Sequence, residues 1–283
     1  GNGFVGVMAV AILCMVSGLC MVWGIAPVVL AVYVAACAVC GRYMITCIGC
    51  AAGVAAGSMG IAGLLHAYEY MIPGPVYSGV MVTEKYLVLL GLAMCLMKIV
   101  YSRNSRSYVR VIVVMSAAVL MGNIVVYADN MLMAAAYGVV EAAIFMCASV
   151  ILKPGIGLLY TYICGDASDV ERDESWNISE GIVSLMALAA VVLWVVPGED
   201  IYGVNPAFML ALVLILYAVY RTCALYGCGM AAVAGGIVSV KLNDSRWLMW
   251  MLLVTLVMLI CRAVTGRRKV SASLFYVLGC VLA

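Results

Sequence analysis

The chain has 283 residues, of which 67% are hydrophobic and only 10% are charged. A soluble domain carries about 25% charged residues to solvate its surface, so this composition excludes an ordinary water-soluble protein. The formal net charge of +2 is too small to indicate a nucleic-acid partner. Because a helix needs about 20 apolar residues to cross a bilayer core, the chain has room for about ten or eleven membrane-spanning helices.

Apolar segments follow one another along almost the whole chain. They predict an all-α fold, a polytopic transmembrane bundle of about ten helices. Prolines fall at the ends of segments, where they cost a helix little. The weakest candidate span is 25–40, because it is short. The expected spans are 4–23, 25–40, 44–65, 83–101, 109–127, 129–153, 180–196, 204–220, 223–242, 247–263 and 271–283.

One long polar stretch, CGDASDVERDESWNIS over residues 164–179, interrupts these segments. We therefore expect a first transmembrane half over 1–163, a cytoplasmic loop over 164–179 and a second transmembrane half over 180–283, truncated at its carboxyl end. The acidic run in this loop is most simply solvated, and docking of a partner is the alternative. The halves share a weak internal repeat, since the WGIAP at 23–27 resembles the YGVNP at 202–206. Internal repeats are frequent in transporters.

Basic residues collect in alternate connections between the expected spans. If the amino terminus is cytoplasmic, the opposite side holds only Lys85, Lys241 and Arg246, as the positive-inside rule requires. This bias predicts a multi-pass protein of a bacterial cell membrane. Glu84 and Lys85 are expected in the lipid headgroups at an outer boundary. The residues expected to act as cytoplasmic anchors are Arg103, Arg106, Arg110, Arg267, Arg268 and Lys269.

Glu141 is the only carboxylate near the middle of an expected span. A charge there costs about 2.5–3.5 kcal/mol on insertion scales, so the group must be neutral, paired or in a polar cavity. One interpretation is a proton or ion site of a transporter. The other is a structural hydrogen bond between helices. A proton-coupled transporter usually carries more than one such group, and we expect no second acid or base at this depth.

Glycines recur at four-residue spacing in the third and ninth expected spans. Such spacing makes a smooth helix face that lets another backbone approach closely. Packing within the chain is the favoured interpretation, and packing between copies in a homo-oligomer stays open. The glycines expected at these helix contacts are Gly49, Gly53, Gly57, Gly227, Gly235 and Gly236.

Motifs of catalysis are absent from the sequence. It has no HExxH zinc motif, no glycine-rich phosphate loop and no cluster of aspartates suited to a two-metal centre. We therefore expect no catalytic residues, no metal site, no cofactor and no enzymatic activity in this chain. Its 13 cysteines fall mostly within apolar segments, where they behave as small buried hydrophobes.

Several stretches, taken in order, resemble a known membrane region. Residues 178–190 (ISEGIVSLMALAA) are similar to an S-x-E-E-I-x-S-L-x-x-L run, and 227–239 to a glycine-rich GGxGLGAAxGVxxG helix. Residues 260–279 are similar to G-x-F-R-x-x-G-K-x-G-x-x-x-G-F-x-L-G, although Ile260 and Ser271 replace glycines. Glu141 matches the glutamate of an A-x-x-E-x-x-x-x-F helix. Together they resemble the membrane-embedded amino-terminal region of the stage II sporulation protein E family of endospore-forming Firmicutes.

This resemblance implies a parent protein with a membrane region, a central region that associates with the cell-division protein FtsZ, and a manganese-dependent PP2C-type serine/threonine phosphatase that activates the forespore sigma factor. The present chain would then be the anchor that places the phosphatase at the asymmetric polar septum during sporulation. The phosphatase's metal-binding aspartates have no counterpart here. The phosphatase is cytoplasmic in this family, whereas the last expected span, 271–283, runs outward. The rival interpretation is a small-solute transporter or permease that uses Glu141.

Overall fold

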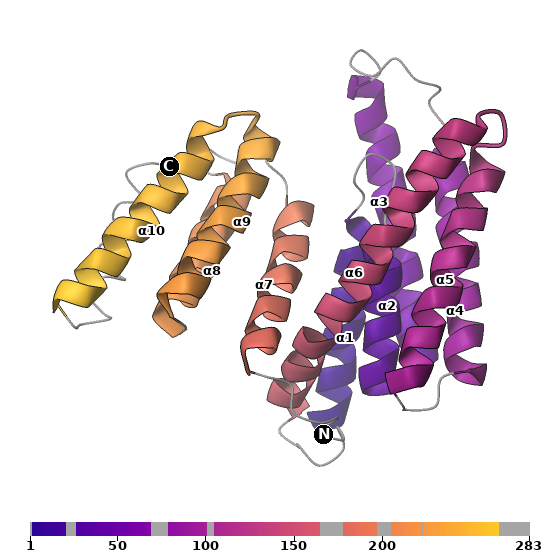
Figure 1. Ribbon diagram of the computed structural model, residues 1–283, viewed down its shortest axis with the longest axis horizontal. Helices are drawn as coiled ribbons and strands as arrows, with labels where there is room; N and C mark the ends of the chain where they lie inside the picture. Colours follow the sequence, from indigo (N-terminus) through magenta and orange to yellow (C-terminus); the bar gives the residue numbers. More distant parts are fainter. Residues whose placement is uncertain are drawn as a thin grey trace. The chain divides into compact units, whose positions relative to one another are not determined.

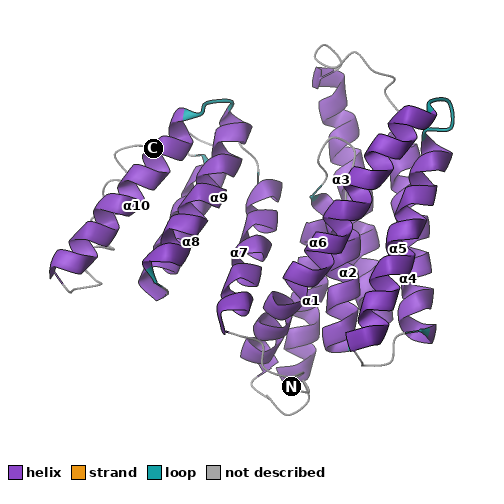
Figure 2. Ribbon diagram, viewed as in Figure 1, coloured by secondary structure: helices purple, strands orange, loops and turns teal. Residues whose placement is uncertain are grey.

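The computed structural model describes residues 2–20, 27–68, 79–100, 105–164, 178–196, 205–221 and 223–265, and these ranges contain ten α-helices and no strand (Figures 1 and 2). The all-helical prediction is therefore confirmed for the described residues. The helices are α1 (Asn2–Leu19), α2 (Pro27–Cys40), α3 (Tyr43–Tyr68), α4 (Gly79–Ile99), α5 (Ser105–Val126), α6 (Met131–Cys164), α7 (Ile178–Val195), α8 (Pro206–Arg221), α9 (Ala224–Leu242) and α10 (Arg246–Thr265).

Within the described ranges, three stretches of helix are long and apolar enough to cross a membrane: Arg106–Val126 in α5, Met131–Ile163 in α6 and Ala224–Leu242 in α9. They support a membrane location. The apolar helices Pro27–Cys40 and Pro206–Tyr220 are shorter than 18 residues. The expected number of about ten spans therefore stays a prediction. The expected span 271–283 and most of the loop over 164–179 lie outside the described residues.

The chain divides into two compact units, Gly1–Leu185 and Met186–Ala283, with the boundary inside α7. In the first unit, α2 packs against α1, α3, α4 and α6. Residues 29–37 of α2 are all buried, as expected for a helix that is apolar on every side. At a rise of 1.5 Å per residue, this helix is only about 21 Å long.

α6 is the longest described helix, at 34 residues, and it continues through Pro154. The expected span ended at residue 153, so the helix extends well beyond that prediction. Proline removes one backbone donor and crowds the preceding turn. The next N–H, that of Gly155, donates to the Ser184 hydroxyl at 2.6 Å. A side chain at Gly155 would collide with Ser184, so glycine permits this close approach of α7. The helix then continues from Gly155 to Cys164.

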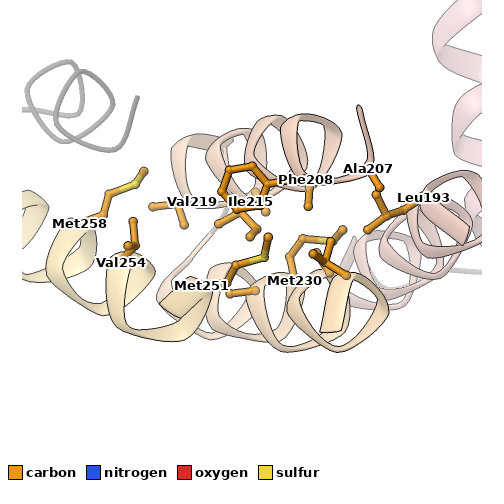
Figure 3. Packing of buried hydrophobic residues seen from close by; sticks show 14 residues of the cluster. Leu193, Ala207, Phe208, Ile215, Val219, Met230, Met251, Val254 and Met258 are labelled. Carbon is orange, nitrogen blue, oxygen red and sulfur yellow. The ribbon is translucent and has the colours of Figure 1, made fainter. Parts of the chain in front are cut away.

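The second unit has its own apolar core, formed where α8, α9 and α10 pack together. Buried residues of this core include Phe208, Ile215, Met230 and Met251 (Figure 3). Phe208 meets Trp247 edge to face, with ring centroids 4.9 Å apart. Methionine is unbranched and adaptable, so it fills the irregular space between these helices.

A tight turn joins α9 to α10. Asn243 ends α9 in the left-handed conformation, with φ of 50°, which asparagine tolerates better than most residues. The Asp244 carboxylate accepts from the backbone N–H of Arg246 at 3.0 Å and so supports the start of α10. The Arg246 guanidinium, 2.9 Å from Asp244, holds the pKa of that carboxyl below its usual value.

Candidate functional site

Glu141 lies in the interior of the first unit and is completely buried. The Lys85 ammonium is 2.8 Å from its Oε2 and 3.1 Å from its Oε1. Lys85 is also buried, with its side chain 4% exposed. The two opposite charges thus form a buried ion pair between α4 and α6. A charge left alone at such a position would be costly, and pairing is how buried charges are tolerated.

Two neutral side chains complete this Lys85–Glu141 cluster, which we define as Lys85, Tyr86, Asn123 and Glu141. The Tyr86 hydroxyl donates to Glu141 Oε1. The Asn123 amide donates to Glu141 Oε2, and its carbonyl oxygen accepts from Lys85 at 3.3 Å. No buried side-chain nitrogen or oxygen in the described part of the chain lacks a partner. The cluster is therefore neutral in total and fully hydrogen-bonded.

Two glycines let the helices approach closely enough for these contacts. A Cβ atom at Gly122 of α5 would lie 3.4 Å from Lys85 Cγ, so the lysine stem runs directly over this glycine. A Cβ atom at Gly138 of α6 would lie 3.1 Å from Leu120 and 3.5 Å from Asn123 Cβ. Gly138 and Glu141 are three residues apart on α6, so they share one helix face.

A pair of tyrosines lies next to the cluster, toward the turn that joins α5 and α6. Tyr127 and Tyr137 stack with ring centroids 5.1 Å apart and an interplanar angle of 7°. Tyr127 follows Asn123 by four residues, and Tyr137 precedes Glu141 by four. Each tyrosine therefore lies about one helical turn from its partner in the cluster. The stacked rings add a second contact between α6 and the end of α5, beside the Lys85–Glu141 cluster.

The placement of Lys85 corrects the sequence-based expectation. We expected no second ionisable group at the depth of Glu141, and the ion pair with Lys85 shows that this expectation was wrong. Lys85 was expected in the headgroups, and its side chain is buried against α5 and α6. α4 begins at Gly79, four residues before the expected start of the span, so Lys85 lies almost two turns inside the helix. Its neighbour Glu84 is exposed and lies on the outer side of α4.

The glycines of α3 contact α1 within the same chain. A Cβ atom at Gly49 would lie 2.7 Å from the Ala11 carbonyl oxygen, and one at Gly53 would collide with the Met15 carbonyl. A Cβ atom at Gly57 would lie 3.1 Å from the carbonyl oxygen of Gly18. The obstructing atoms belong to backbone and cannot rotate away. These three glycines therefore set the close packing of α1 on α3.

The glycines of α9 differ from one another. A Cβ atom at Gly227 would lie 2.6 Å from the Val219 side chain of α8, and one at Gly235 would lie 3.2 Å from Leu248 of α10. Gly236 has no atom within 4 Å of such a Cβ. Two of the three glycines thus serve packing within the second unit, and Gly236 faces open space.

The structure describes two of the six residues expected as cytoplasmic anchors. Arg106 and Arg110 lie in the first turns of α5 and are exposed. The other four, Arg103, Arg267, Arg268 and Lys269, lie outside the described residues. No group of histidine, cysteine, aspartate or glutamate side chains suited to a metal ion occurs in the described ranges.

Comparisons with known proteins assign this chain to no family. No protein-family description, no curated protein and no solved structure matches this chain.

Proposed function

We propose that this chain is a membrane-embedded anchoring domain, in which the Lys85–Glu141 cluster fixes the helix arrangement and does no catalysis. The observation that supports this proposal is that the cluster is fully hydrogen-bonded. Every buried polar side-chain atom in the described ranges has a hydrogen-bond partner. A satisfied polar network gives a bundle one defined packing, whereas a working proton site needs a route by which protons enter and leave.

The resemblance to the sporulation phosphatase family supplies the finer proposal. In this interpretation the domain has several spans, its amino terminus is cytoplasmic, and it holds a phosphatase at the polar septum. The family's intramembrane glutamate corresponds to Glu141, the residue at the centre of the cluster. The parent protein's manganese, its association with FtsZ and any self-association belong to this proposal as well.

Localisation tests the anchoring proposal. A fluorescent fusion of the full-length protein is expected to concentrate at the polar septum of sporulating cells. Replacement of residues 1–283 with an unrelated multi-pass membrane domain, made as a matched control, is expected to leave the signal spread over the membrane. Equal septal enrichment of both fusions would contradict a role of this domain in localisation.

Transport is the second candidate function, and the buried ion pair is the observation that favours it. Intramembrane ionisable residues commonly mark ion or substrate pathways. In this interpretation Glu141 exchanges a proton or a cation during each transport cycle. A Glu141→Gln variant that folds normally should then lose proton-coupled uptake in vesicles. Unchanged fluxes for a panel of small solutes would remove this candidate, and they would leave the anchoring proposal unaffected.

A further inference from the structure

The oxygens around the Lys85 ammonium belong to two helices other than its own. Both carboxylate oxygens of Glu141 on α6 and the amide oxygen of Asn123 on α5 lie within 3.3 Å of Nζ. An ammonium has three N–H donors, and these three oxygens are acceptors. The face of the Tyr86 ring lies 4.7 Å from the same nitrogen, which adds a favourable cation–π contact.

The aliphatic part of the Lys85 side chain carries the ammonium from α4 to these three oxygens. Its stem crosses Gly122, where Cγ and Cδ would lie 3.4 and 3.5 Å from an added Cβ atom. The stem thus lies against Gly122 of α5, and the terminal ammonium meets the polar atoms. The glycine that contacts the stem and the oxygens that accept from the ammonium are therefore separate features.

We infer that Asn123 and Glu141 form a binding site for a primary ammonium group, and that Lys85 fills this site permanently from α4. The site selects a cation that donates several hydrogen bonds, because its acceptors are arranged around one nitrogen. A free amine or another cation enters only when the lysine ammonium is absent. This inference rests on the anchoring proposal, because a permanently bound Lys85 ammonium leaves Glu141 no place for a proton or cation that is exchanged in each transport cycle.

Chemical rescue of a lysine-deleted variant tests the inference. Lys85→Ala removes Cγ, Cδ, Cε and Nζ, and n-propylammonium carries the same chain of carbon atoms ending in an ammonium. Thermal unfolding of the purified full chain in detergent is measured with n-propylammonium chloride, sodium chloride or tetramethylammonium chloride at equal ionic strength. We expect a saturable rise in the Tm of Lys85→Ala with n-propylammonium alone, since a ligand that binds only the folded state stabilises it.

Matched variants separate binding at the site from a general effect of the amine. The wild-type protein should show no saturable rise, because Lys85 occupies the site. The double variant Lys85→Ala/Glu141→Gln should show none, because it lacks the carboxylate. An equal response in these proteins, or an equal response of Lys85→Ala to 1-propanol, would overturn the inference. It would also be overturned if Lys85→Ala were folded but did not respond, or if it were unfolded and n-propylammonium did not restore folding.

Discussion

Neutralising one member of the Lys85–Glu141 pair should destabilise the protein at least as much as neutralising both. Lys85→Met keeps the length of the side chain and removes its charge, and Glu141→Gln keeps the shape of the carboxyl group. Each single change leaves the opposite charge buried without its partner, since Glu141 is 0% and Lys85 8% exposed. The double variant leaves no charge behind.

The magnitude follows from the geometry of the pair. At the observed 2.8 Å, two unit charges attract each other by about 6 kcal/mol if the effective dielectric constant is about 20. Desolvation of the two ions, at several kcal/mol each, offsets most of this attraction. Removing one partner loses the attraction and keeps the desolvation cost of the other ion, so each single variant should lose about 3–5 kcal/mol. The double variant should lose no more than either single one, which corresponds to a coupling energy of about 3 kcal/mol or more.

The assay is a double-mutant cycle on the free energy of unfolding, measured by circular dichroism in mixed detergent micelles. The matched control is the same cycle at Asp244 and Arg246, whose side chains are 28% and 78% exposed and whose coupling should be close to zero. Additive effects of Lys85→Met and Glu141→Gln, or a coupling no larger than that of the control, would refute a tightly coupled buried pair.

Three further expectations follow from individual contacts. Gly53→Ala should destabilise the protein by about 1–3 kcal/mol in thermal unfolding, whereas Gly236→Ala, which meets open space, should be neutral or stabilising by up to about 1 kcal/mol. Ser184→Ala should lower the free energy of unfolding by about 1 kcal/mol, because it removes the acceptor of a buried backbone N–H in α6. Tyr137→Ala should lower the free energy of unfolding by about 1 kcal/mol or more, because it removes the stacking contact with Tyr127; an unchanged free energy of unfolding would contradict a stabilising role for the stacked tyrosines.

The sequence predicted the helices well because long apolar segments are conspicuous, and each of the first ten expected spans overlaps a described helix, although α6 runs past its expected end at residue 153. It also singled out Glu141, since a carboxylate in an apolar segment is conspicuous. Lys85 was missed because the expected span began at residue 83, which placed the lysine at the membrane boundary. A usable signal existed: Lys85 and Glu141 carry opposite charges, and each lies in an apolar segment. However, a count of charged residues along the sequence does not predict which helices pack together, because helix pairing depends on tertiary contacts.

The first unit is held together by two kinds of contact that lipid cannot imitate. Apolar side chains gain little by leaving lipid for another helix, because both environments are equally apolar. The glycines of α3 instead bring its backbone against α1, and hydrogen bonds of the Lys85–Glu141 cluster join α4, α5 and α6. Each contact is directional or steric, so it is lost if a helix rotates or slides by one residue. Because these contacts depend on register, the buried ion pair of Lys85 and Glu141 favours one packing of α4, α5 and α6 over packings in which a helix has slipped.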